Sequence, residues 1–102
     1  MGLREQNLVV YYGQGDSMLD RIHDGDALLF DLSDKRPVDG RVYLFSSADT
    51  GLTVKRLVDY GGRWFLEADN KTEKNWTKPV PMDGRHPYTI EGRLRWIGSW
   101  EG

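Results

Sequence analysis

The stretch "LTVKRLVDYGGRWFLEA", from Leu52 to Ala68, decides which fold class this sequence predicts. Its two ends, Leu52 to Tyr60 and Arg63 to Ala68, are rich in β-branched and aromatic side chains, which favour strands. Gly61 and Gly62 separate these ends, and a Gly-Gly pair suits the tight turn of a β-hairpin. The stretch therefore predicts two neighbouring antiparallel strands.

Four more segments on either side of this hairpin carry strand patterns. They are Leu8–Tyr12, Ala27–Leu32, Arg41–Phe45 and Thr89–Ile97. In the last segment, alternation predicts Ile90, Leu94 and Trp96 on one face and Arg93 and Arg95 on the other. Six short strands with turn signals between them predict an all-β sheet or a barrel-like fold.

The remaining segments give weaker signals. Residues 69–87 are rich in Asn, Lys, Thr and Pro and predict a long irregular connection. No segment predicts a helix of ten or more residues, although residues 18–22 could form one helical turn. The 102 residues are expected to form one domain, 1–102, without repeats or a linker.

Composition narrows the classes of function. The 14 basic and 16 acidic residues give a net charge of −2, which does not suggest a nucleic-acid-binding surface. The absence of cysteine excludes disulfides and cysteine metal ligands, and we expect no cofactor and no metal. No apolar run approaches the roughly 20 residues of a membrane span, and no signal peptide is visible. The expectation is a cytoplasmic protein without a membrane partner.

The stretch "GQGDSMLDRIHDGD" contains a serine, Ser17, that could act as a nucleophile if a base took its proton. The two histidines, His23 and His86, could in principle serve with one of the many aspartates. Such a triad can be assembled on paper from almost any sequence with this composition, so the signal is weak. Lysine is the other base that works in this role, as in Ser-Lys variants of the triad.

Lys55 is the candidate base, because it lies in the middle of the strand predicted after Gly51. Period-two counting places Thr53, Lys55 and Leu57 on one face of this strand and Arg56 on the other. Burial beside Leu57 would favour the neutral amine that a base needs. The alternative is an edge-strand lysine that points to water, and spacing alone favours that alternative.

The order of several motifs resembles that of the LexA-like serine peptidase domain, which self-cleaving bacterial and phage repressors share with the UmuD proteins. The motifs are "GDSM", "IHDGD", "VKRL", "LEADN" and "YTIEGRLRWIG", and Lys55 follows Ser17 by 38 residues. The similarity extends from about Asn7 onward. It implies a LexA-like C-terminal peptidase fold of twisted, mostly antiparallel strands.

The resemblance implies a role for each matching residue. Ser17 corresponds to the nucleophile and Lys55 to the general base, while Asp16 and Met18 would position the loop. The backbone N–H of Ser17, with others in its loop, would stabilise the oxyanion. "DGD", residues 24–26, corresponds to the turn into the next strand rather than to a metal site. Arg56 would face away from Lys55 as a surface or interface residue.

The family also implies partners. The domain would form a homodimer, and Trp96, Ile97 and Trp100 suit either the dimer interface or the sheet core. Operator DNA would bind through an N-terminal helix-turn-helix domain, which this chain lacks, and a RecA filament would stimulate cleavage after DNA damage. Relatives cleave themselves at a small-residue bond such as Ala-Gly, and no Ala precedes Ser17.

Three alternatives stay open beside a self-cleaving repressor domain. The first is a dimerisation or ligand-sensing module of a phage-type regulator, with a Ser-Lys pair that is never used. The second is a UmuD-like polymerase accessory subunit. The third, a type I signal peptidase, ranks last because no membrane anchor is present.

Overall fold

The computed structural model describes residues 7–12, 25–48, 51–69, 78–82 and 87–98, which form a single antiparallel sheet. Its seven strands are β1 (Leu8–Tyr12), β2 (Ala27–Asp31), β3 (Val42–Ser47), β4 (Gly51–Tyr60), β5 (Arg63–Glu67), β6 (Val80–Pro81) and β7 (Thr89–Gly98). The described part of the chain contains no α-helix. The predicted all-β class, with mostly antiparallel strands, is confirmed.

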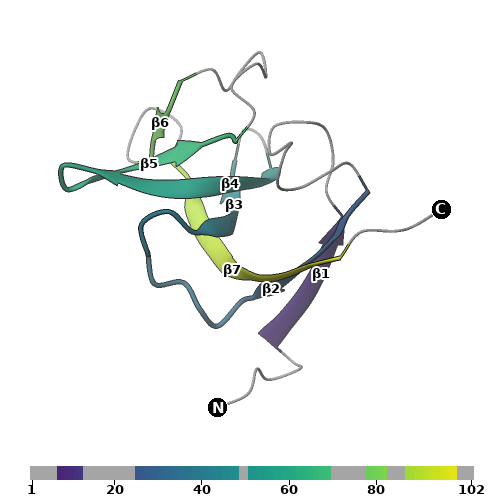
Figure 1. The fold of residues 1–102 in the computed structure, drawn as a ribbon. Helices are drawn as coiled ribbons and strands as arrows, with labels where there is room; N and C mark the ends of the chain where they lie inside the picture. The colour runs from purple at the N-terminus through teal and green to yellow at the C-terminus, as the bar shows by residue number, and fades with distance from the viewer. Residues whose placement is uncertain (1–6, 13–24, 49–50, 70–77, 83–86, 99–102) are drawn as a thin grey trace.

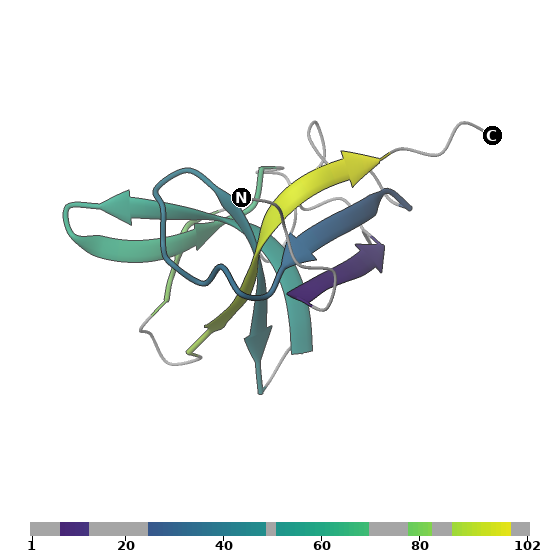
Figure 2. The same cartoon turned by 90° about the horizontal axis from the view of Figure 1, so that it is seen from below.

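The strand order, β1-β2-β7-β3-β4-β5-β6, places the last strand in the middle of the sheet. β7 pairs with β2 on one side and with β3 on the other. Figure 1 shows β7 as the long curved strand between the β1–β2 pair and the β3–β6 half, and Figure 2 shows the strong twist of the sheet from below. β7, which lies within the motif "YTIEGRLRWIG", therefore joins the two halves of the sheet.

The hairpin of β4 and β5 forms as the sequence predicts. Gly61 and Gly62 have φ angles of 65° and 92°, and Tyr60 pairs with Arg63 across the two-residue turn. Positive φ at both central residues is typical of the type I′ turn, whose twist matches that of the strands. The Gly62 N–H also donates a hydrogen bond of 2.8 Å to the Asp59 carboxylate.

Apolar side chains pack on both faces of the sheet, because β3 is buried on both sides. Val42 and Leu44 belong to the first core cluster, whereas Tyr43 and Phe45 belong to the second. The other buried members of the first cluster are Leu28, Phe30 and Val54. The other buried members of the second cluster are Leu57 and Leu66.

A bulge in β7 overturns part of the predicted alternation. The β2–β7 register shifts by one residue, so that Leu94 and Trp96 pair with neighbouring residues of β2 and Arg95 is the extra residue. An extra residue reverses the facing of every side chain beyond it. Ile97 therefore packs with Leu94 against the first cluster, while Trp96 is 57% exposed. The predicted face shared by Leu94 and Trp96 is wrong.

A second register shift, between β3 and β7, separates Ile90 from Leu94. Ile90 pairs with Phe45 and packs against the second cluster, not the first.

Five predicted strands match the structure within two residues at each end. The sixth, Leu8–Tyr12, matches β1 at both ends. The helical turn predicted at residues 18–22 lies outside the described residues.

Strand β6 was not predicted, because two residues are too short to show a pattern. Its Pro81 pairs with Phe65 of β5. β6 lies at the edge of the sheet, where proline is tolerated because its missing N–H is not needed by a further strand. The predicted irregular connection over residues 69–87 therefore contains one short stretch of sheet.

Candidate functional site

Lys55 is buried in the interior of the sheet. β4 lies between β3 and β5, and only 3% of the Lys55 surface is exposed. The alternative of an edge-strand lysine pointing to water is therefore wrong. The prediction that Lys55 shares a face with Leu57 is confirmed by the register, in which Lys55 pairs with Tyr43 of the second core cluster.

Two oxygens of β4 hold the Lys55 ammonium group. Its Nζ atom donates hydrogen bonds of 2.8 Å to Thr53 Oγ1 and of 3.1 Å to the carbonyl oxygen of Val54. Thr53 lies on the same face as Lys55, two residues earlier, and pairs with the buried Phe45. The strand thus fixes the position of the Nζ atom, because both acceptors belong to the same short segment as the lysine itself.

The other predicted catalytic residues lie outside the described residues. They are Asp16, Ser17 and Met18, and the same holds for His23 and His86. The distance from Ser17 to Lys55 and the source of the oxyanion donors stay predictions. In the "DGD" motif, Gly25 has a φ angle of 87° and Asp26 is buried just before β2, which agrees with the predicted turn into a strand.

Arg56, the next residue, lies on the other face of β4 as predicted, and its partly exposed side chain joins two other segments of the chain. Its Nε and Nη2 atoms donate hydrogen bonds of 2.9 and 2.7 Å to the two carboxylate oxygens of Asp69. Its Nη1 atom donates a hydrogen bond of 2.7 Å to the carbonyl oxygen of Gly40. The hydrogen bond with Asp69 raises the pKa of Arg56. The motifs "VKRL" and "LEADN" are therefore joined by a bidentate ion pair.

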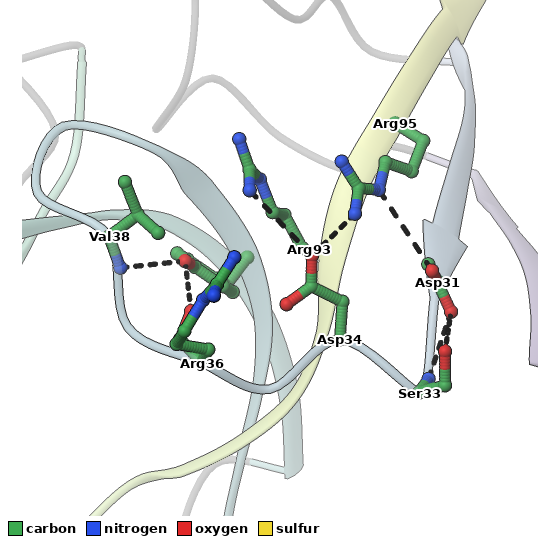
Figure 3. A network of polar contacts seen from close by, with 8 residues as sticks. Asp31, Ser33, Asp34, Arg36, Val38, Arg93 and Arg95 are labelled. Carbon is green, nitrogen blue, oxygen red and sulfur yellow. Dashed lines mark hydrogen bonds and ion pairs between the residues drawn. The ribbon is translucent and has the colours of Figure 1, made fainter. Parts of the chain in front are cut away.

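A polar network ties the loop after β2 to the middle of β7 (Figure 3). Arg93 Nη1 lies 3.6 Å from the Asp34 carboxylate, and Arg95 Nη2 donates a hydrogen bond to it. At the start of the loop, the N–H and the hydroxyl of Ser33 donate hydrogen bonds of 2.9 and 2.6 Å to Asp31. These bonds, the hydroxyl first, lower the pKa of Asp31.

The roles of these arginines are not predicted by the sequence. Alternation places Arg93 and Arg95 on one face of the last strand but indicates no partner for either. The partners come from a loop about 60 residues earlier in the chain, at Asp34. The sequence signal is the pair of arginines two residues apart in "RLRW", and this spacing does not indicate that Asp34 is the partner.

An apolar row crosses the outer face of the β1-β2-β7 end of the sheet. Val10 pairs with Leu29, which pairs with Trp96, so the three side chains point to the same side. Val10 and Trp96 are 51% and 57% exposed. A Cβ atom at Gly98 would clash with the Trp96 ring, which therefore lies along its own strand. We call Val10, Leu29 and Trp96 the outer row. Trp100 lies outside the described residues.

Among the residues that the structure describes, no helix has the length and apolar character needed to cross a membrane.

An all-β antiparallel sheet with a buried lysine on an interior strand is consistent with the LexA-like fold that the motifs predict. The model of the family described as Peptidase S24-like matches residues 1–95. The chain belongs to this family, which confirms the predicted resemblance.

One curated relative extends the comparison. The chain is 30% identical over 100 residues to an uncharacterized HTH-type transcriptional regulator of Haemophilus influenzae. The match covers 96% of this chain and 40% of that protein, so the chain spans less than half of the relative's length.

Proposed function

We propose that this chain is the C-terminal regulatory domain of a bacterial or phage transcriptional repressor, and that Ser17 and Lys55 give it self-cleaving activity. The observation that carries the proposal is the burial of Lys55, at 3% exposure, on an interior strand of a peptidase S24-like domain. The similarity to an HTH-type transcriptional regulator supports the repressor part.

The surroundings of Lys55 suit a general base. Burial disfavours the charged ammonium relative to the neutral amine. Thr53 Oγ1 and the Val54 carbonyl oxygen accept hydrogen bonds from the Lys55 Nζ atom and hold it in place, and the neutral form of this amine carries a lone pair. The lone pair would then take the proton of the Ser17 hydroxyl.

The reaction follows from this proton transfer. The Ser17 oxygen attacks the carbonyl carbon of the scissile peptide bond, and backbone N–H groups of the Ser17 loop stabilise the oxyanion. The protonated Lys55 amine returns the proton to the leaving nitrogen as the peptide bond breaks. Water then attacks the ester on Ser17, with Lys55 again as the base, and releases the new carboxylate.

The outer row is the surface that we assign to the homodimer. Exposed aromatic and aliphatic side chains that run across three strands are typical of an interface between copies of a chain. A twofold dimer would hold two DNA-binding domains over two operator half-sites, and cleavage would release them. A RecA filament formed after DNA damage would act as the stimulus.

The test uses the full-length natural protein that contains this chain. Intact mass is followed during incubation between about pH 7 and 10, the range that approaches the ordinary deprotonation of lysine. We expect one internal cleavage whose rate rises with pH, and none in Ser17→Ala or Lys55→Met. If the parent stays intact throughout, or if either variant is cleaved at the parental rate, the proposal is wrong. An intact parent would leave a dimerisation or sensing module.

A further inference from the structure

Four arginines line one pocket where three strands meet. Arg41 directly precedes β3, Arg56 belongs to β4, and Arg93 and Arg95 belong to β7. The pocket has a volume of about 280 Å³, and its other lining residues are Gly40, Val42 and Leu94. None of these described lining residues is acidic. We call this site the arginine pocket.

The backbone around the arginine pocket is fixed by the sheet. The N–H of Gly40 donates a hydrogen bond of 2.7 Å to the carbonyl of Leu57, and the N–H of Leu57 donates one of 2.8 Å to the carbonyl of Arg41. Arg56 also binds the Gly40 carbonyl. The wall that carries Arg41 is therefore attached to β4, and the site does not depend on a free loop.

Among the described residues, the four guanidinium groups differ in how closely they are paired. Arg56 donates hydrogen bonds to the Asp69 carboxylate and to the Gly40 carbonyl oxygen. Arg95 binds the Asp34 carboxylate, and its Nε atom lies 4.0 Å from the Asp31 carboxylate. Arg93, by contrast, is 3.6 Å from Asp34, which is too long for a hydrogen bond.

Arg41 has the least compensation. It is exposed, and no described carboxylate lies within ion-pair distance of its guanidinium group. Asp31, Asp34 and Asp69 lie against Arg56, Arg93 and Arg95, and Glu67 lies opposite Arg56 in the register of β4 and β5. Arg41 and Arg93 are therefore the two arginines of the pocket that hold N–H donors for an anion.

We propose that the arginine pocket binds the phosphate group of a small ligand. Guanidinium forks match the oxygens of phosphate in bidentate geometry. A tetrahedral phosphate accepts hydrogen bonds from donors outside one plane, which suits arginines that arrive from separate strands, whereas a carboxylate offers two oxygens in one plane. The volume lies just below the roughly 300 Å³ at which sites for drug-sized ligands begin.

The phosphate of a nucleic acid is a poorer match for the same site. A nucleic acid needs an extended basic track, whereas this chain has a net charge of −2 and the arginines gather around one hollow. The proposal concerns a ligand site and goes beyond self-cleavage. The phosphate-binding proposal does not depend on the proposed catalytic role of Ser17.

The test is an NMR titration of the 102-residue chain with inorganic phosphate at constant ionic strength. The amides of residues 40–42 and 93–95 are followed. Parallel titrations use glycerol phosphate, as a phosphate monoester, and acetate, as a carboxylate. The variants are Arg41→Gln and Arg93→Gln, with Arg63→Gln on the β4–β5 hairpin as the charge-matched control.

We expect saturable shifts of these amides with one or both phosphate compounds and none with acetate. Removal of either pocket arginine should weaken binding about tenfold, the effect of losing one charged hydrogen-bonding partner. Arg63→Gln should bind as the parent does. The proposal is overturned if no phosphate compound saturates, if acetate binds as tightly, or if Arg63→Gln weakens binding as much as the pocket variants do.

Discussion

The two faces of β4 use neighbouring cations in opposite ways. Lys55 is buried on the face of the second core cluster, and its two described hydrogen bonds run to neutral oxygens. Arg56, on the other face, is locked to the carboxylate of Asp69. Arg56 is thereby held as a charged structural tie, whereas Lys55 sits where burial favours the neutral amine. Because side chains alternate along β4, the candidate base Lys55 and the ion-paired Arg56 lie on opposite faces although they are consecutive residues.

The largest expected effect is that of Lys55→Met on cleavage. Loss of the base should slow self-cleavage of the full-length protein by at least about a hundredfold, the lower range for general-base catalysis. Methionine keeps an unbranched side chain without a buried amine, so the free energy of unfolding should stay within about 1 kcal/mol of the parent value. Mass spectrometry gives the first quantity and urea denaturation the second.

Arg56→Met should show the reverse pattern. It leaves the half-buried Asp69 carboxylate without its bidentate partner, which should lower the free energy of unfolding by about 2 kcal/mol. The rate of cleavage in the folded protein should change much less than in Lys55→Met. A double-mutant cycle with Asp69→Asn isolates the pair. Equal stability of Arg56→Met and the parent would show that the ion pair is no anchor.

The outer row gives the next prediction, on association. Trp96→Glu should weaken the proposed homodimer by about 2 kcal/mol, the size of an interface hot spot, and should change the free energy of unfolding little because the side chain is 57% exposed. Analytical ultracentrifugation measures the dimer. Leu52→Glu, at a site 50% exposed elsewhere on the sheet, is the control. Equal effects of both substitutions would remove the assignment of the outer row.

The smallest effect concerns acid stability at Asp31. The folded-state pKa of Asp31 lies below its ordinary value of 3.8, first because of the Ser33 hydroxyl. The unfolded chain therefore binds this proton more readily. The ionised Asp31 carboxylate stabilises the folded state fully at a pH above the ordinary pKa of 3.8, and this stabilisation is lost as the pH falls through the folded-state pKa. Asp31→Asn should flatten this part of the acid unfolding profile, followed by circular dichroism, and an unchanged slope would contradict the assignment.

Local patterns were enough to predict the β4–β5 hairpin and the facing of Lys55. Gly61 and Gly62 specify their turn through their own φ angles, and alternation along β4 is unbroken. The same alternation failed in β7, because the two register shifts depend on how β7 pairs with β2 and β3. A single strand carries no signal for such a bulge.

The contacts that join distant segments were also beyond local reasoning. The Arg56–Asp69 pair and the arginine pocket depend on which strands become neighbours in the sheet. Charged residues are common in the sequence, so their partners cannot be chosen without the topology. The motif resemblance supplied the Ser17–Lys55 pairing, for which the structure describes only Lys55.

The measurement that tests the central claim most directly is labelling of the 102-residue chain with a fluorophosphonate, which reacts with activated serines. Peptide mass spectrometry locates the label in the parent and in Lys55→Met, with folding of both checked by circular dichroism. If Lys55 activates Ser17, the label lies on Ser17 in the parent and is lost in the folded variant. Equal labelling of both proteins, or no label on Ser17 in the folded parent, would contradict the assignment of Lys55 as the base.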